Sequence, residues 1–145
     1  MNTIDTTPAV PAAVSLEWSM RYTMTPKALA LIRIQVRQRL TLWSWTADDV
    51  ESAVFIANEL AGNAVQHAAM PGHQALMRLA LLEDDSLLID VSDPVAAFPD
   101  FGASRAVGPE AEEGRGLSMV RVLGADLWWF LRPNVGKTVR AHLRG

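Results

Sequence analysis

The chain of 145 residues contains no cysteine, which excludes disulfide bonds, thiol nucleophiles and cysteine-ligated metal sites. It also lacks any apolar run long enough to cross a bilayer. Residues 1–14 have neither the basic start nor the long apolar stretch of a secretion signal. We therefore expect a cytoplasmic protein that does not bind a membrane.

An excess of positive charge is missing as well. The formal net charge is −3, so there is no electrostatic indication of direct nucleic-acid binding. The three histidines do not have the spacing of a zinc site. Half of the residues are hydrophobic and 20% are charged, which is typical of a soluble globular domain. We predict a flexible tail rich in Thr, Ala and Pro over residues 1–14, followed by one domain over 15–145.

The hydrophobic periodicity predicts an alternation of strands and helices. Two of the strands are apolar on both faces, which places them in the middle of a sheet, whereas the first strand is expected at an edge. The predicted strands are 16–24, 74–82, 87–92, 127–131 and 138–143, and the predicted helices are 26–43, 47–69 and 117–123. This order predicts an α+β fold, a two-layer sandwich with helices on one face of a mostly antiparallel sheet.

The second helix carries the segment Glu59-Leu-Ala-Gly-Asn-Ala-Val-Gln-His67. Glu59 and Asn63 are four residues apart, so a carboxylate and an amide lie side by side on one helical face. Such a pair can hold a hydrated magnesium ion, and the carboxylate can accept a proton from an attacking hydroxyl. A solvated polar flank would show the same spacing. The apolar stripe of this helix runs through Val50, Val54, Ala57, Ala61, Ala64 and Ala68.

Asp93 stands at the end of an apolar strand and at the start of a long segment, residues 94–113, without clear periodicity. A buried carboxylate needs a partner, and Asp93 could accept a hydrogen bond from an exocyclic amine such as that of adenine. It could equally be a turn residue that caps the strand before Pro94. Segments of this length inside a small domain are usually functional or mobile.

Two glycine-containing motifs follow. Gly114-Arg115-Gly116-Leu117 opens a short helix, where free N–H groups and an arginine could bind an anion, although a flexible hinge is also compatible with it. Gly136-Lys137-Thr138 lacks the glycine spacing of a P-loop and is most simply a hairpin turn. Thr138 starts a strand and could present its hydroxyl to a neighbouring pocket.

Taken in chain order, these motifs resemble the Bergerat-fold (GHKL) ATPase/kinase superfamily, which includes gyrase and the histidine kinases. The wording of the segments ELAGNAVQHA, GRGLSMV and GKTV is most similar to the anti-sigma-factor serine/threonine kinases, among which are many actinobacterial ATP-binding regulators. The resemblance covers roughly residues 16 to 144.

The resemblance implies that the chain binds ATP and Mg²⁺. Asn63 would coordinate the magnesium ion, Glu59 would be the general base or would position the nucleophile, and Asp93 would bind the adenine amino group. Residues 94–113 would form the ATP lid. The other nucleotide-binding residues would be Gly114, Arg115, Gly116 and Leu117 at the phosphates and Thr138 at the adenine end, near Asp93.

The resemblance also implies partners. A kinase of this type phosphorylates a serine or threonine of a small anti-anti-sigma (STAS-domain) protein and sequesters a sigma factor. A homodimer is expected. We place its interface on the first strand and first helix, with Trp18, Tyr22 and the arginines of that helix.

The sequence departs from the superfamily pattern directly after Asp93. The first glycine box, typically Asp-x-Gly-x-Gly, is here Asp93-Pro94-Val95-Ala96-Ala97. Proline fixes its own φ and has no N–H donor, so it stiffens the start of the predicted lid. This difference supports a second hypothesis, a nucleotide-dependent regulatory binding module without significant kinase activity.

Overall fold

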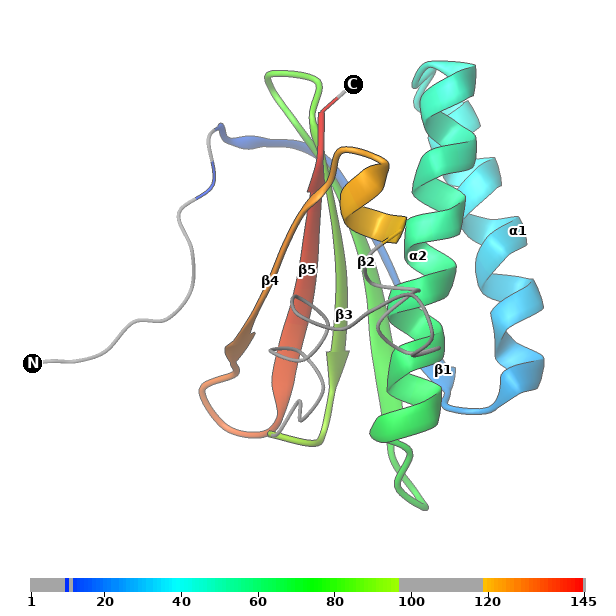
Figure 1. Cartoon of the computed structure of the whole chain (residues 1–145), viewed down its shortest axis with the longest axis vertical. Coiled ribbons are helices and arrows are strands. Elements are labelled where there is room, and N and C mark those ends of the chain that lie inside the picture. The colour runs from blue at the N-terminus through cyan, green and yellow to red at the C-terminus, as the bar shows by residue number, and fades with distance from the viewer. Residues whose placement is uncertain (1–9, 11, 97–118, 145) are drawn as a thin grey trace, which may run out of the picture.

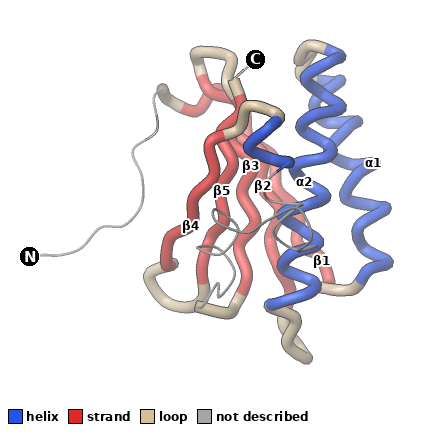
Figure 2. Tube along the Cα trace, viewed as in Figure 1, coloured by secondary structure: helices blue, strands red, loops and turns tan. Residues whose placement is uncertain are grey.

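The computed structural model describes residue 10 and residues 12–96 and 119–144. Most of the predicted tail and the predicted lid from residue 97 onward therefore lie outside the described residues. The described elements are β1 (Val14–Thr23), α1 (Pro26–Leu42), α2 (Ala47–His67), β2 (Gln74–Leu82), β3 (Leu87–Asp93), β4 (Asp126–Leu131) and β5 (Lys137–Leu143) (Figures 1 and 2). This order confirms the predicted strands and the first two predicted helices, with ends shifted by only a few residues. Of the third predicted helix, 117–123, residues 119–122 are helical, and residues 117 and 118 lie outside the described part of the chain.

The strands form one sheet in the order β1-β2-β3-β5-β4, and all four neighbouring pairs are antiparallel. The predicted edge position of β1 and the interior positions of β2 and β3 are confirmed. Both helices lie on one face of this sheet, so the fold is the predicted α+β two-layer sandwich (Figure 1). Among the described residues, no helix is long and apolar enough to span a membrane.

Helix α2 packs against the middle of the sheet, chiefly on β3, and α1 packs along α2 (Figure 1). The alanine-rich stripe allows this close approach because small side chains let a helix lie near the strands. The predicted stripe is buried at all six positions, namely Val50, Val54, Ala57, Ala61, Ala64 and Ala68. Glu59 and Asn63 lie off this stripe and are half-buried at the margin of the core.

Tyr22 is a core residue, which corrects its assignment to a dimer surface. Its side chain is only 3% exposed, and its hydroxyl donates to the carbonyl of Ala61 on α2 (3.3 Å). Trp18, four residues earlier on the same strand face, is partly buried against the core, with the guanidinium of Arg39 5.8 Å from its ring centroid. Pleating turns both aromatic rings toward the helices, so they contribute packing within the chain.

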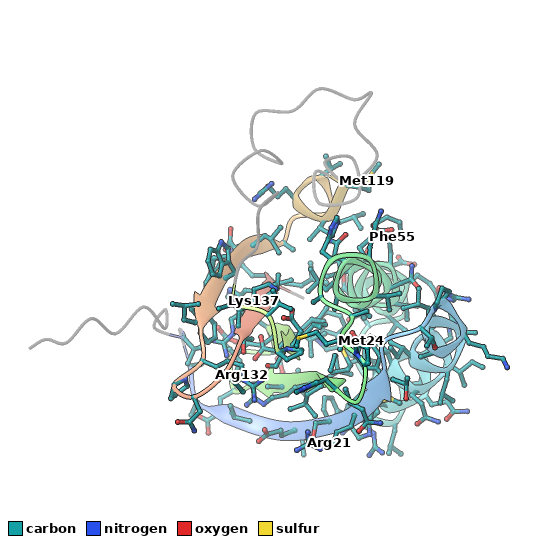
Figure 3. The ribbon with its side chains drawn as sticks, turned by 90° about the horizontal axis from the view of Figure 1, so that it is seen from below. Arg21, Met24, Phe55, Met119, Arg132 and Lys137 are labelled. Carbon is teal, nitrogen blue, oxygen red and sulfur yellow. The ribbon has the colours of Figure 1, made fainter. Side chains whose placement is uncertain are left out.

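Strand β5 has two chemically different faces. Lys137, Val139, Ala141 and Leu143 point toward the helices, whereas Thr138, Arg140 and His142 alternate with them on the outer face. Figure 3 shows Lys137 on the helix side of the sheet and Arg21, on β1, on the outer side. A lysine at the first position of the otherwise apolar helix-facing side of this strand requires a buried partner.

Candidate functional site

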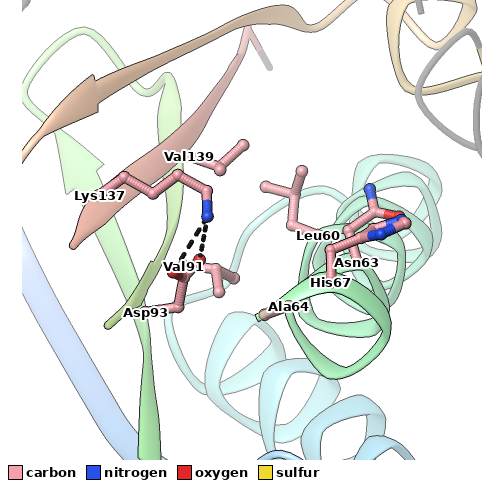
Figure 4. A pocket seen from close by; sticks show the side chains of 8 residues that line it. All are labelled: Leu60, Asn63, Ala64, His67, Val91, Asp93, Lys137 and Val139. Atoms are coloured by element: carbon pink, nitrogen blue, oxygen red, sulfur yellow. Dashed lines mark hydrogen bonds and ion pairs between the residues drawn. The ribbon is translucent and has the colours of Figure 1, made fainter. Parts of the chain in front are cut away.

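A small cavity lies between α2 and the adjoining ends of β3 and β5 (Figure 4). Its volume of about 10 Å³ is enough for one water molecule. The cavity brings together Asn63 and Asp93, two of the residues selected from the sequence. Its lining consists of Leu60, Asn63, Ala64, His67, Val91, Asp93, Lys137 and Val139.

The α2 wall of the site carries the predicted metal and base residues. The Nδ2 atom of Asn63 is buried and has no hydrogen-bond partner among the described residues. A buried amide group without a partner costs free energy, so this position favours a polar ligand. Glu59, one turn earlier, is half-buried, and this burial raises the pKa of its carboxyl above the usual value. A carboxylate with a raised pKa is a better proton acceptor, as a general base requires.

The opposite wall holds an ion pair that the sequence reasoning missed. Asp93 is 2% exposed and Lys137 is 3% exposed. The Nζ atom of Lys137 lies 3.0 Å from each carboxylate oxygen of Asp93 and also donates to the carbonyl of Val95 (3.0 Å). The backbone N–H of Val95 donates to Oδ1 of Asp93 (2.8 Å). The carboxylate of Asp93 is therefore both buried and neutralised by Lys137.

A signal for this pair was present in the sequence. Val139, Ala141 and Leu143 alternate on one face of their strand, and the same period of two extended backward reaches Lys137. This extension places an ammonium group on the core side, next to the end of the neighbouring strand.

Gly136 fixes the approach of β5 to the end of β3. Its φ is +73°, in the left-handed region that favours glycine. A Cβ atom at this position would lie 1.8 Å from the backbone oxygen of Asp93. The glycine is therefore required by close packing as well as by its backbone conformation, and it sets the position from which Lys137 reaches Asp93.

The structure does not bring Thr138 to the cavity. Its Oγ1 lies 2.7 Å from Oγ of Ser92 on the outer face of the sheet, whereas Asp93 and Lys137 face α2. A role of Thr138 at a bound nucleotide stays a prediction. Gly114, Arg115, Gly116 and Leu117 lie outside the described residues, and their predicted phosphate contacts remain predictions too.

The donor set fits ATP and Mg²⁺ on the α2 side. Within the described part of the chain, no three acidic or histidine side chains cluster as a metal site. The amide oxygen of Asn63 would be the residue that holds the ion, and the ion would supply neutralisation of the phosphate charge. At the other end, Asp93 has the acceptor chemistry for an adenine amino group, but the ammonium of Lys137 already occupies that acceptor.

Comparison with known proteins places the chain in a family. Residues 22–143 match the family model of the histidine kinase-like ATPase domain. No curated protein matches the sequence. Among solved structures, the chain is similar to the RsbU and RsbW domains of Rv1364c from Mycobacterium tuberculosis, with 21% identity and a TM-score of 0.59. That match covers 87% of this chain but only 32% of the other, so the chain spans about a third of that protein.

A second similar structure is that of the SiaB–SiaC complex from Pseudomonas aeruginosa, with 15% identity and a TM-score of 0.60. The match covers 87% of this chain and 88% of the other. At these identities the two structures support the fold alone. The family model covers most of the chain, including the α2 segment, Asp93 and the β5 motif, and the chain therefore belongs to the histidine kinase-like ATPase domain family.

Proposed function

We propose that this chain is an ATP-binding regulator of the anti-sigma-factor kinase type. It would phosphorylate a serine or threonine of a small anti-anti-sigma (STAS-domain) protein and sequester a sigma factor in the cytoplasm. The observation that carries this proposal is the shared cavity: Asn63 from α2 and Asp93 from β3 line it together, and Glu59 lies one turn before Asn63.

The residues have chemically distinct tasks in this proposal. Bound Mg-ATP would supply the γ-phosphoryl group. Asn63 would hold the magnesium ion, and Glu59 would accept the proton of the partner's hydroxyl as its oxygen bonds to phosphorus and ADP leaves. Phosphoryl transfer depends mostly on positioning and charge neutralisation, so two well-placed side chains can contribute much of the catalysis.

The comparisons support a protein partner. One similar solved structure is a complex of two proteins, SiaB and SiaC. By analogy of fold, this chain would bind a partner on the surface around its site. We also propose a homodimer, as the sequence resemblance implies. The partly buried Trp18 and the arginines of α1 remain our proposed contribution of β1 and α1 to that dimer.

A phosphorylation assay tests the kinase. Wild-type chain, a candidate STAS-domain partner and radiolabelled Mg-ATP should give a labelled partner. Glu59→Gln should reduce the labelling rate at least 100-fold while Mg-ADP affinity changes less than threefold, because the glutamine retains the shape but cannot accept the proton. Asp48→Asn, an exposed acidic position in the first turn of the same helix, is the matched control and should leave the rate unchanged.

A second function is favoured by the Asp93–Lys137 pair and by Pro94. The chain would then be a nucleotide-dependent regulatory binding module without significant kinase activity. In that case the partner stays unlabelled in the same assay, but its affinity for the chain changes when Mg-ADP or Mg-ATP is added. If neither labelling nor a nucleotide-dependent affinity change occurs, both functions are wrong.

A further inference from the structure

We infer that Lys137 closes the base end of the nucleotide pocket and competes with the ligand for Asp93. The inference rests on the proposed nucleotide binding and adds a regulatory step to the same site. A ligand with an exocyclic amine would bind only after the ammonium group has moved out of the pocket, so binding and displacement of the lysine would be one exchange.

The contacts of Nζ are those that an incoming amino group would need. An ammonium group offers three N–H donors, and Lys137 directs them at the carboxylate of Asp93 and the carbonyl of Val95, all at 3.0 Å. An exocyclic amine is also an N–H donor and would use the same acceptors. The two donors would compete for this carboxylate, because it is buried and the cavity beside it has room for about one water molecule.

The small volume of the cavity also indicates that Lys137 must move before a nucleotide can bind. Pockets for nucleotide-sized ligands enclose roughly 300–1,000 Å³, whereas the cavity between Asp93 and α2 has about 10 Å³. In Figure 4 the Lys137 side chain extends from β5 across the pocket toward Asp93, facing the side chains of α2. Movement of this side chain away from Asp93 would enlarge the cavity without moving the helix or the sheet.

Lysine is suited to such movement. Its charge is a compact group on a flexible four-carbon stem, unlike the rigid planar fork of arginine. Lys137 is also the first residue of β5, directly after the turn that contains Gly136. Leaving Asp93 buried without a partner would be costly. Departure of the ammonium should therefore be coupled to arrival of another donor.

The chain contains only two lysines, Lys27 and Lys137, which permits a direct test on the unmodified protein. Lys27 is exposed and Lys137 is buried. During reductive methylation followed by mass spectrometry, Lys137 should react at least tenfold more slowly than Lys27. Saturating Mg-ADP should accelerate labelling of Lys137 at least tenfold and leave Lys27 unchanged. Binding of Mg-ADP with Lys137 still protected would contradict the exchange.

Variants give an independent measurement by calorimetric titration with Mg-ADP. Lys137→Ala removes the competitor and should tighten binding at least tenfold. Lys137→Arg keeps a cation beside Asp93 and should not tighten it, and Lys27→Ala is the surface control. Lys137→Thr serves in place of the alanine variant if the latter does not fold.

The outcomes separate the two proposals. The lysine closure would be overturned, and nucleotide binding left intact, by two results together. The wild type and Lys137→Ala would bind Mg-ADP equally tightly, and Lys137 of the wild type would be protected from methylation both with and without Mg-ADP. Absence of binding to the wild type and to every Lys137 variant, with native circular dichroism, would overturn nucleotide binding itself. Binding to Lys137→Ala alone would mean that the wild-type lysine keeps the pocket closed to this nucleotide.

Discussion

Two buried ion pairs connect the same two strands, β3 and β5, but they differ in chemistry and surroundings. Asp90 pairs with Arg140 on the outer face of the sheet, and Asp93 pairs with Lys137 on the face toward α2. The pairs are three residues apart on each strand. Because strand, sheet and burial are shared, the comparison isolates the effects of side-chain type and of neighbouring groups.

The outer pair is part of a closed network. Arg140 donates two hydrogen bonds to Asp90 (2.8 and 2.9 Å), and its guanidinium lies 5.0 Å from the ring centroid of Phe130. Arg78 also donates to Asp90 (3.2 Å) and to Glu17 on β1 (2.6 Å). A bidentate fork fixes both distance and plane, so this network ties β1, β2, β3 and β5 together.

The inner pair borders a cavity and faces a buried amide atom of Asn63 that has no partner among the described residues. Its cation is a flexible ammonium without a planar geometry to satisfy. The comparison therefore indicates that the outer pair holds the sheet together, whereas the inner pair can exchange its cation for another donor. Four changes can test this distinction.

The largest effect is expected at Gly136, which positions only the inner pair. Gly136→Ala should lower the free energy of unfolding by about 4 kcal/mol or more, the range of severe backbone and packing conflicts, because the new Cβ would overlap the backbone of Asp93. Urea denaturation measures this. Gly72→Ala is the control: Gly72 has φ +81° and no atom within 4 Å of an added Cβ, so it should cost only about 1–2 kcal/mol. Equal losses of stability in Gly136→Ala and Gly72→Ala would contradict the close approach of Gly136 to the backbone of Asp93.

The second-largest loss of stability is expected when the outer pair is broken. Arg140→Met should cost about 3 kcal/mol, the lower end of the range for breaking a buried ion pair, because Asp90 loses the bidentate fork but keeps the hydrogen bond from Arg78 (3.2 Å). Because the network lies on the opposite face from the cavity, Mg-ADP affinity should change less than threefold in the folded variant. A tenfold loss of affinity with intact secondary structure would show that the two faces are coupled.

A smaller loss is expected for the inner pair. Lys137→Met should cost about 2 kcal/mol, within the range for a buried polar group left without its partner. Asp93 keeps the N–H of Val95, and the neighbouring cavity can admit a water molecule. The double variant Asp93→Asn with Lys137→Met should recover part of the loss. If Lys137→Met lowered the free energy of unfolding more than Arg140→Met does, the inner pair would be the one that stabilises the sheet.

Most of the fold could be predicted because its signals are local. The alanine stripe of α2 follows the helical period, and the strands between Gln74 and Asp93 are apolar enough to require interior positions. The structure also brings Asn63 and Asp93, both selected from the sequence, to one cavity, and their roles at a bound nucleotide stay predictions. That selection depended on the resemblance, since a helix residue and a strand-end residue share no local pattern.

Cross-strand contacts were harder to predict. Tyr22 looked like a surface aromatic because β1 is an edge strand, but its ring faces α2 and its hydroxyl bonds to Ala61. Lys137 looked like a turn residue because it follows Gly136 in a polar segment. Its partner, Asp93, is supplied by strand register, which depends on the assembled sheet.

The smallest effect concerns Glu59, a half-buried carboxylate that has no hydrogen bond or ion pair to any described residue. Burial raises the pKa of Glu59 above 4.5, so the folded state binds its proton more tightly than the unfolded state does. The stability gained from this proton is fully present below about pH 4.5 and is lost as the pH rises through the folded-state pKa. At pH 7 the ionised Glu59 is therefore unfavourable, unlike the paired Asp90 and Asp93.

Glu59→Gln should consequently raise the free energy of unfolding at pH 7, by no more than about 0.5 kcal/mol for a single partly exposed position. The difference should disappear in denaturation curves recorded below pH 4.5. When the pH is lowered, the proposed phosphorylation of the partner should decline at a pH above the ordinary pKa of a glutamate. The reason is that Glu59, with its raised pKa, takes up its proton at that higher pH. A variant less stable than the wild type at pH 7 would mean that the charge of Glu59 has a stabilising partner, and the contrast between paired and unpaired carboxylates would then be lost.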